Sequence, residues 1–149
     1  MSDDWLQFIS TDPQWVPSDA NREAAVQLLR EWRAEADEVA SIVSEQVEFI
    51  DQGAILERVS WPYCGSELAV DWWQDAFDRA SERQFADLSV ATPCCGHSMS
   101  LNDLDFDWPA GFARFVIWAM NPADDLTDAQ VSALERTLDT PLRRIWRHL

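Results

Sequence analysis

One pentapeptide pattern occurs twice in this chain, as Trp61-Pro62-Tyr63-Cys64-Gly65 and as Thr92-Pro93-Cys94-Cys95-Gly96. In each copy the proline stiffens the turn, and the glycine lets the backbone curl after the cysteine. Each copy follows a stretch that reads as extended, at 54–60 and at 86–92. The repeat therefore predicts two strands that each lead into a tight turn, which restricts the middle of the chain to a pair of hairpins.

Both pentapeptides resemble the Cys-Pro-x-Cys-Gly knuckle of a zinc ribbon, in which two such turns present thiolates to one tetrahedral ion. The first cysteine of each knuckle is replaced here, by Trp61 in one copy and by Thr92 in the other. The resemblance covers residues 54–104. It implies a degenerate zinc-ribbon-like domain whose two knuckles face each other, with a helix inserted between them.

The chain is also similar to a group of uncharacterised bacterial proteins in which a ribbon precedes two short sequence segments. In this chain the segments are Ser100-Leu101-Asn102-Asp103-Leu104 and residues 107–115, which read Asp-Trp-Pro-Ala-Gly-Phe-Ala-Arg-Phe. No activity is assigned to that group. This resemblance therefore implies a fold and not a function.

Four residues are candidate metal ligands: Cys64, Cys94, Cys95 and His97. Cys64 and Cys95 hold the second position of each knuckle, and the other two are the only further soft donors nearby. Adjacent cysteines rarely bind one ion, because successive side chains diverge, and the indole of Trp61 fills volume at a ligand position. Zinc is a candidate cofactor, but the sequence favours a ribbon without metal, in which the cysteines are small buried groups.

A thiolate–imidazole pair is the main catalytic arrangement to consider, with Cys94 or Cys95 beside His97 or His148. The chain has only two histidines, and no separate motif would orient His97 toward a thiol. The four glycines are isolated, so there is no phosphate-binding loop. We therefore expect no enzymatic activity.

Charge is the strongest bulk signal, because 27 acidic residues face 11 basic ones and the net charge is -16. A field of this sign repels phosphate backbones, which argues against nucleic acid as a partner, and it speeds encounter with a basic protein. Solubility or adaptation to high salt is the alternative explanation of the charge. The candidate partner contacts are carboxylates in two acidic stretches: Asp103, Asp105, Asp107, Asp124 and Asp125.

These observations favour a small acidic binding protein, of the inhibitor or immunity type, that masks a basic partner surface. The alternative is a zinc-supported structural or regulatory module of unknown pathway. The sequence leaves the partner's identity and the oligomeric state open.

The expected location of the protein follows from its cysteines, from the charge at the start of the chain and from the length of its apolar runs. Three cysteines, an odd number clustered near the two turns, favour a reducing compartment, and we expect a cytoplasmic protein. The acidic start of the chain does not fit a signal peptide. The longest apolar run, Phe115 to Met120, is too short to cross a bilayer, so we expect no membrane association.

The overall expectation is a single α+β domain over residues 1–149, with an antiparallel sheet that includes the ribbon-like hairpin pair. Apolar residues spaced three and four apart predict the helices. The predicted segments are an irregular arm over 1–17, a helix from Ser18 to about Ala36, an inserted helix over 71–84 with a capping box of Asp71 and Gln74, a helix from a capping box of Thr127 and Gln130 to Leu138, and a last helical piece from Pro141.

The predicted strands alternate with these helices along the chain. They comprise extended structure within 38–50, a strand over 54–60 that returns through Leu68 and Val70, strands over 86–92 and 98–104, and a strand from Phe112 to Met120.

Overall fold

Four antiparallel strands form the main sheet, in the spatial order β2-β8-β1-β9. The structure is a computed structural model that describes residues 3–51, 59–60, 62, 67–93, 96–106 and 109–148. The strands of the main sheet are β1 (Asp4–Ser10), β2 (Glu38–Ile50), β8 (Gly111–Met120) and β9 (Leu142–His148). Together with its helices this sheet gives an α+β fold, as predicted.

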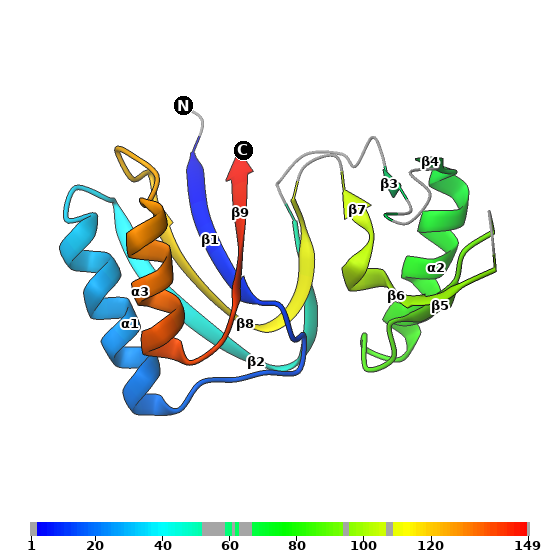
Figure 1. Cartoon of the computed structure of the whole chain (residues 1–149), viewed down its shortest axis with the longest axis horizontal. Coiled ribbons are helices and arrows are strands. Elements are labelled where there is room, and N and C mark those ends of the chain that lie inside the picture. Colours follow the sequence, from blue (N-terminus) through cyan, green and yellow to red (C-terminus); the bar gives the residue numbers. More distant parts are fainter. Residues whose placement is uncertain are drawn as a thin grey trace.

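Two helices cover one side of this sheet, α1 (Asp19–Trp32) and α3 (Asp128–Leu138), which lie side by side in Figure 1. The chain runs β1-α1-β2 and later β8-α3-β9, so each helix joins two strands that are not neighbours in the sheet. This connectivity is the split βαβ, or ferredoxin-like, arrangement. We call these six elements the plait.

The helices of the plait begin where the sequence predicts. The Ser18 side chain accepts a hydrogen bond from the Asn21 amide at the start of α1. At α3, Thr127 and Gln130 form a complete capping box, which satisfies amides that have no partner inside the helix. The core between the helices and the sheet is made of fully or almost fully buried side chains: Leu6, Phe8, Ala25, Leu29, Val39, Phe115, Ile117, Ala119, Leu126, Leu134 and Leu138.

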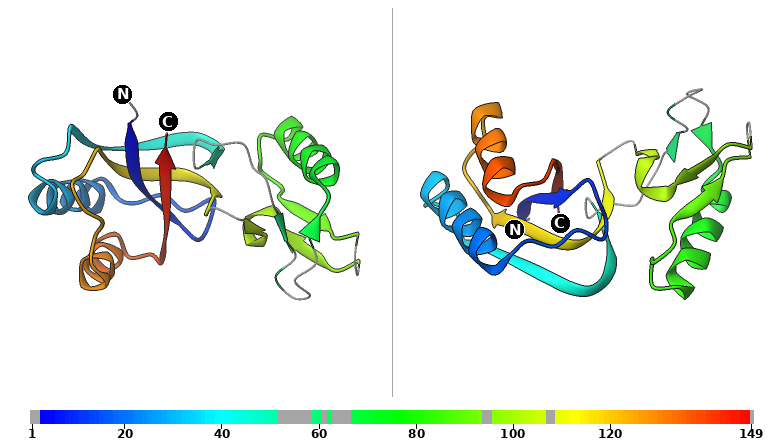
Figure 2. Two further views of the ribbon diagram at one scale, coloured as in Figure 1. Left: turned by 90° about the horizontal axis from the view of Figure 1, so that it is seen from above. Right: turned by 60° about the horizontal axis from the view of Figure 1, so that its bottom comes forward.

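The residues between β2 and β8 form a second body, which we call the inserted lobe (residues 51–110). Figures 1 and 2 show it at the far ends of β2 and β8, away from α1 and α3. Its elements are β3 (Val59–Ser60), β4 (Glu67–Leu68), α2 (Val70–Glu82), β5 (Ser89–Ala91), β6 (Ser98–Ser100), a short 3-10 helix (Leu101–Asp103) and β7 (Asp105–Phe106). The strands form two small sheets, β4-β3-β7 and β5-β6.

Aromatic side chains fasten the lobe to the plait. Phe49 of β2 and Phe112 of β8 lie with ring centroids 5.0 Å apart, and Phe49 also meets Phe77 of α2 at 5.3 Å. Trp73 of α2 contacts Phe106 of β7 edge to face at 5.3 Å. The long strands of the plait thus supply part of the core of the lobe, and a bulge in β2 between Val43 and Glu48 marks where the strand passes from one body to the other.

Two segments differ from the sequence prediction in kind. Residues 4–10, expected within an irregular arm over 1–17, form strand β1 in the interior of the sheet, between β8 and β9. Residues 142–148, expected to continue a helical piece from Pro141, form strand β9, which pairs with β1 from Asp4↔His148 to Ser10↔Leu142. In both cases long-range pairing decided the conformation against the local signals.

Two smaller predictions are also wrong. Helix α2 begins at Val70 after Ala69, with no side-chain cap, so Asp71 and Gln74 form no capping box. The strand expected over 98–104 ends at Ser100, where the 3-10 helix begins. Of the helices in the described part of the chain, none combines the length and apolar character needed to cross a membrane.

Candidate functional site

Each pentapeptide of the repeat falls between two paired strands. Strands β3 and β4 pair with Val59 opposite Leu68, on either side of the first pentapeptide. Strands β5 and β6 pair with Val90 opposite Met99, on either side of the second. Both predicted hairpins are therefore present, although β4 ends at Leu68 and does not reach Val70. They lie in two separate small sheets, so the expectation of one antiparallel sheet that includes both hairpins is wrong in this detail.

The second turn is tightly closed by its backbone. The Thr92 amide donates to the His97 carbonyl at 3.0 Å, and the Gly96 amide donates to the Thr92 carbonyl at 2.8 Å. Gly96 has φ of +68°, a left-handed conformation that glycine adopts without strain. This curled backbone is what a metal-binding knuckle requires, and His97 is exposed beside it.

The predicted metal ligands fall largely outside the part of the chain that the structure describes. Cys64, Cys94 and Cys95 lie outside it, as does Trp61, and only His97 is placed. Within the described residues, no three His, Cys, Asp or Glu side chains are grouped as metal ligands would be. The donor set therefore stays a prediction.

A buried polar junction connects the lobe to the plait through the two segments that carried the second resemblance. Asn102 is 2% exposed. Its side-chain oxygen accepts from the Phe112 amide at 2.9 Å and from Arg143 at 3.2 Å, and its amide nitrogen donates to the Thr11 carbonyl at 3.2 Å. Arg143 also donates to the Ala110 carbonyl at 2.9 Å. These segments therefore have a structural role, which holds two bodies together.

Burial at this junction affects the charged side chain of Arg143. Burial lowers the pKa of the Arg143 guanidinium from its ordinary value, and the nearby carboxylate of Asp103 raises it in part. Because an arginine remains charged even with a lowered pKa, the junction holds a positive charge in partly dry surroundings. Asn102 and Ala110 supply the oxygens that this charge needs.

The predicted partner contacts do not form one surface. Asp103 and Asp105 are exposed on the lobe, whereas Asp124 and Asp125 lie in the loop between β8 and α3 of the plait, at the other end of the molecule in Figure 1. Asp107 lies outside the described residues.

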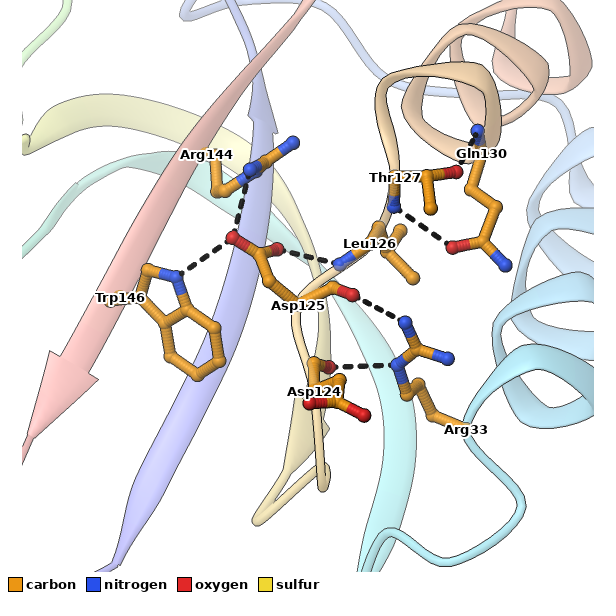
Figure 3. Close-up of polar contacts among 8 residues, drawn as sticks. All are labelled: Arg33, Asp124, Asp125, Leu126, Thr127, Gln130, Arg144 and Trp146. Atoms are coloured by element: carbon orange, nitrogen blue, oxygen red, sulfur yellow. Dashed lines mark hydrogen bonds and ion pairs between the residues drawn. The ribbon is translucent and has the colours of Figure 1, made fainter.

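The loop with Asp124 and Asp125 is already engaged within the protein (Figure 3). Arg33 donates to the Asp124 carbonyl at 2.7 Å and also to the Asp125 carbonyl. The Asp125 carboxylate accepts from Arg144 at 2.8 Å and from the Trp146 indole at 3.3 Å. Asp125 therefore ties this loop to β9.

Sequence reasoning missed a row of carboxylates on α2. Asp71, Asp75, Asp78 and Glu82 are all exposed, and their spacing of four, three and four residues places them along one side of the helix. The opposite side carries Trp73 and other core residues. The same three-and-four spacing that identified the buried side could have identified this row, which we call the α2 acidic row.

Most arginine side chains form hydrogen bonds or ion pairs within the protein. Six donate to main-chain carbonyls: Arg22, Arg30, Arg33, Arg79, Arg114 and Arg143. Three more form ion pairs with carboxylates of the chain: Arg83, Arg144 and Arg147. These contacts hold most guanidinium groups against the protein, although Arg79 and Arg83 are exposed at α2 and offset part of the charge of the acidic row.

Comparison with known proteins adds no relative, since no protein-family model, curated protein or solved structure matches this chain.

Proposed function

We propose that this protein is a small acidic binding protein, of the inhibitor or immunity type, that masks a basic surface of a partner protein. The observation that carries the proposal is the division of charge in the structure. Most arginines bond to carbonyls or carboxylates of the protein itself, while the four carboxylates of the α2 acidic row face solvent.

This distribution of charge matters because a carboxylate paired with an arginine attracts a basic partner less than one without an arginine partner does. A carboxylate with an arginine at ion-pair distance contributes little field beyond a few ångströms, whereas a row of free carboxylates attracts cations over about 10 Å at 0.1 M salt. Asp71, Asp75, Asp78 and Glu82 supply such a row, and Asp103 and Asp105 add charge to the same lobe. Asp125 contributes less, since Arg144 and Trp146 already bind its carboxylate.

The test begins with a partner captured by the full chain and identified by mass spectrometry. A quadruple variant neutralises the row: Asp71→Asn, Asp75→Asn, Asp78→Asn and Glu82→Gln. Exposed ion pairs contribute roughly 0.2–1 kcal/mol each, so affinity should fall by about tenfold or more. A control with the same change in net charge replaces four exposed glutamates of the plait with glutamine: Glu23, Glu31, Glu45 and Glu48.

The proposal requires two results. Affinity for the captured partner must fall as salt is raised, and the α2 variant must weaken it more than the control does. A partner whose affinity is independent of salt, or equally affected by both variants, would remove the proposal.

A second candidate function is a zinc-supported structural or regulatory module. The paired hairpins and the left-handed Gly96 favour it, because they are the backbone features of a knuckle. If zinc binds, Cys64, Cys94, Cys95 and His97 are the residues that would hold it, and the ion would crosslink the two turns. Metal analysis of protein purified without chelator tests this, with one zinc per chain expected and no bound metal as the contrary result.

A further inference from the structure

A groove of about 450 Å³ runs along the lobe between α2 and β5. Its lining combines apolar residues with charged and polar ones: Trp72, Ala76, Ala80, Val90 and Ala91 with Arg79, Glu82, Arg83, Asp87 and Ser89. Ala76 and Ala80 are the small residues of its helical wall, which leaves room for side chains of a bound molecule.

The other wall of the groove is the free edge of strand β5. Side chains of Ser89 and Ala91 point to the opposite face from that of Val90, because side chains alternate along a strand. A groove lined by all three residues must therefore run along the edge of the strand and not over one face. Within the described residues, β6 is the one strand paired with β5, and no residue of β6 lines the groove.

The hydrogen-bond pattern shows which backbone groups this edge presents. Leu101 donates to the Leu88 carbonyl, and Thr92 donates to the His97 carbonyl, so these positions bond across the hairpin. Alternation in an antiparallel ladder then turns the main-chain groups of Ser89 and Ala91 outward. The Ser89 amide is capped by the Asp87 carboxylate at 3.0 Å. This leaves the Ser89 carbonyl and both main-chain groups of Ala91 directed toward the groove.

We propose that this groove binds an extended segment of the basic partner, which adds to β5 as a third strand. The proposal rests on the proposed function and names how the partner is held. Main-chain bonds to Ser89 and Ala91 supply affinity, and alternate side chains of the segment enter the groove above Ala76 and Ala80.

The negative charge near the groove favours a basic segment as its occupant. Residues 70–87 carry five carboxylates and two arginines, a net charge of -3, and Arg83 is paired with Asp87 at 3.5 Å. The charges of the lining itself cancel, since Arg79 and Arg83 offset Glu82 and Asp87, so the excess of negative charge comes from the neighbouring α2 acidic row. A segment whose Lys or Arg side chains reach out of the groove toward that row suits these surroundings. A second copy of the chain is disfavoured, because each copy carries a net charge of -16.

The probe is a displayed library of heptapeptides in which Lys or Arg alternates with Val, Ile or Thr, selected on the full chain. An enriched peptide should bind Ala91→Pro about tenfold more weakly than the parent or worse, because proline removes the outward amide hydrogen and fills the edge. The matched control Ala91→Thr keeps that hydrogen and should bind like the parent. In the parent, the peptide should slow hydrogen exchange at the Ala91 amide by at least about tenfold.

A readout that does not depend on a protein variant comes from the peptide. N-methylation of alternate amides should abolish binding in one of the two registers only, as expected for a strand that bonds on one side. No enriched peptide, equal binding to the Ala91→Pro and Ala91→Thr proteins, or equal effects of both methylation registers would overturn the proposal.

These outcomes separate the two proposals. A salt-sensitive partner that binds the Ala91→Pro protein normally keeps the acidic binding function and removes the strand addition. A peptide that depends on Ala91 while no captured partner responds to salt keeps the groove as a strand-binding site and removes the electrostatic function.

Discussion

The side-chain oxygen of Asn102, in the inserted lobe, accepts a hydrogen bond at 2.9 Å from the backbone amide of Phe112, in the plait. The same oxygen accepts from Arg143 of β9. One buried amide side chain thus satisfies donors from two strands of the plait. This atom is therefore one of the contacts, with the Phe49–Phe77 ring contact, that hold the lobe on the sheet.

We predict that Asn102→Ala destabilises the protein by about 2–3 kcal/mol, because a buried amide hydrogen and a guanidinium lose their acceptor. The neighbouring Asp103→Asn, at an exposed position, should change stability by no more than about 0.5 kcal/mol. Denaturant unfolding measures both. A loss below about 1 kcal/mol for Asn102→Ala would mean that water replaces the missing oxygen.

We predict that Gly111→Ala is destabilising by about 1–3 kcal/mol through overpacking. A Cβ at Gly111 would lie 2.7 Å from Cδ1 of Ile9 and 2.8 Å from a guanidinium nitrogen of Arg143. Since Ile9→Val removes Cδ1, the double variant should be more stable than the sum of the two single effects. Simple additivity in this double-mutant cycle would contradict the contact.

Gly96 should resist substitution for a different reason. Nothing lies within 4 Å of a Cβ built there, but φ is +68°. Gly96→Ala should therefore cost about 1–2 kcal/mol from backbone conformation alone, while Gly96→Asn costs less, since asparagine adopts the left-handed region more readily. Equal losses for the two variants, measured by thermal unfolding, would indicate a cause other than φ.

Asp87 should make stability depend on acid pH. Hydrogen bonds from the Ser89 amide and side chain lower the pKa of the Asp87 carboxyl. A lowered pKa means that the stabilisation is present above the unfolded value of about 3.9 and is lost as pH falls through the folded pKa. A carboxyl-carbon NMR titration should place the Asp87 midpoint below that value, and Asp87→Asn should flatten the stability profile there. A midpoint at or above the unfolded value would be the contrary result.

The helices of the plait could be predicted because their signals are local. The cap at Ser18 and the capping box of Thr127 and Gln130 depend on residues within one turn, so they survive in the fold. Asp71 and Gln74 have the same spacing, yet Gln74 donates to Asp78 instead, since α2 begins two residues earlier than that pattern requires. A capping pattern identifies a helix more reliably than its first residue.

Strands β1 and β9 could not be predicted, because what stabilises them lies far away in sequence. Residues Leu6, Phe8 and Ile9 are all fully buried, on both faces of the sheet, so β1 lacks the alternation of polar and apolar residues that identifies a strand. In β9, Pro141 and the arginines resemble a helix end, but Ile145 is fully buried in the sheet. Pairing with β1 outweighs the weak helix preference of these residues.

In the candidate site, too, the features set by nearby residues could be predicted and those set by long-range packing could not. The repeat predicted both hairpins from local turn chemistry, although β6 ends at Ser100. The separation of Asp103 from Asp125, and the engagement of Asp125 by Arg144, depend on how the chain returns across the plait. No spacing in the sequence predicts this long-range path of the chain.

The place of β1 in the sheet also sets the order of events on the ribosome. Strand β1 is synthesised before the other strands of its sheet, yet both of its neighbours, β8 and β9, emerge more than a hundred residues later. Until then Ile9 lacks the buried residues of its own core cluster, Ala113, Val116 and Ile145. Because the main sheet is completed only after β8 and β9 have been translated, we expect slow folding and binding by chaperones.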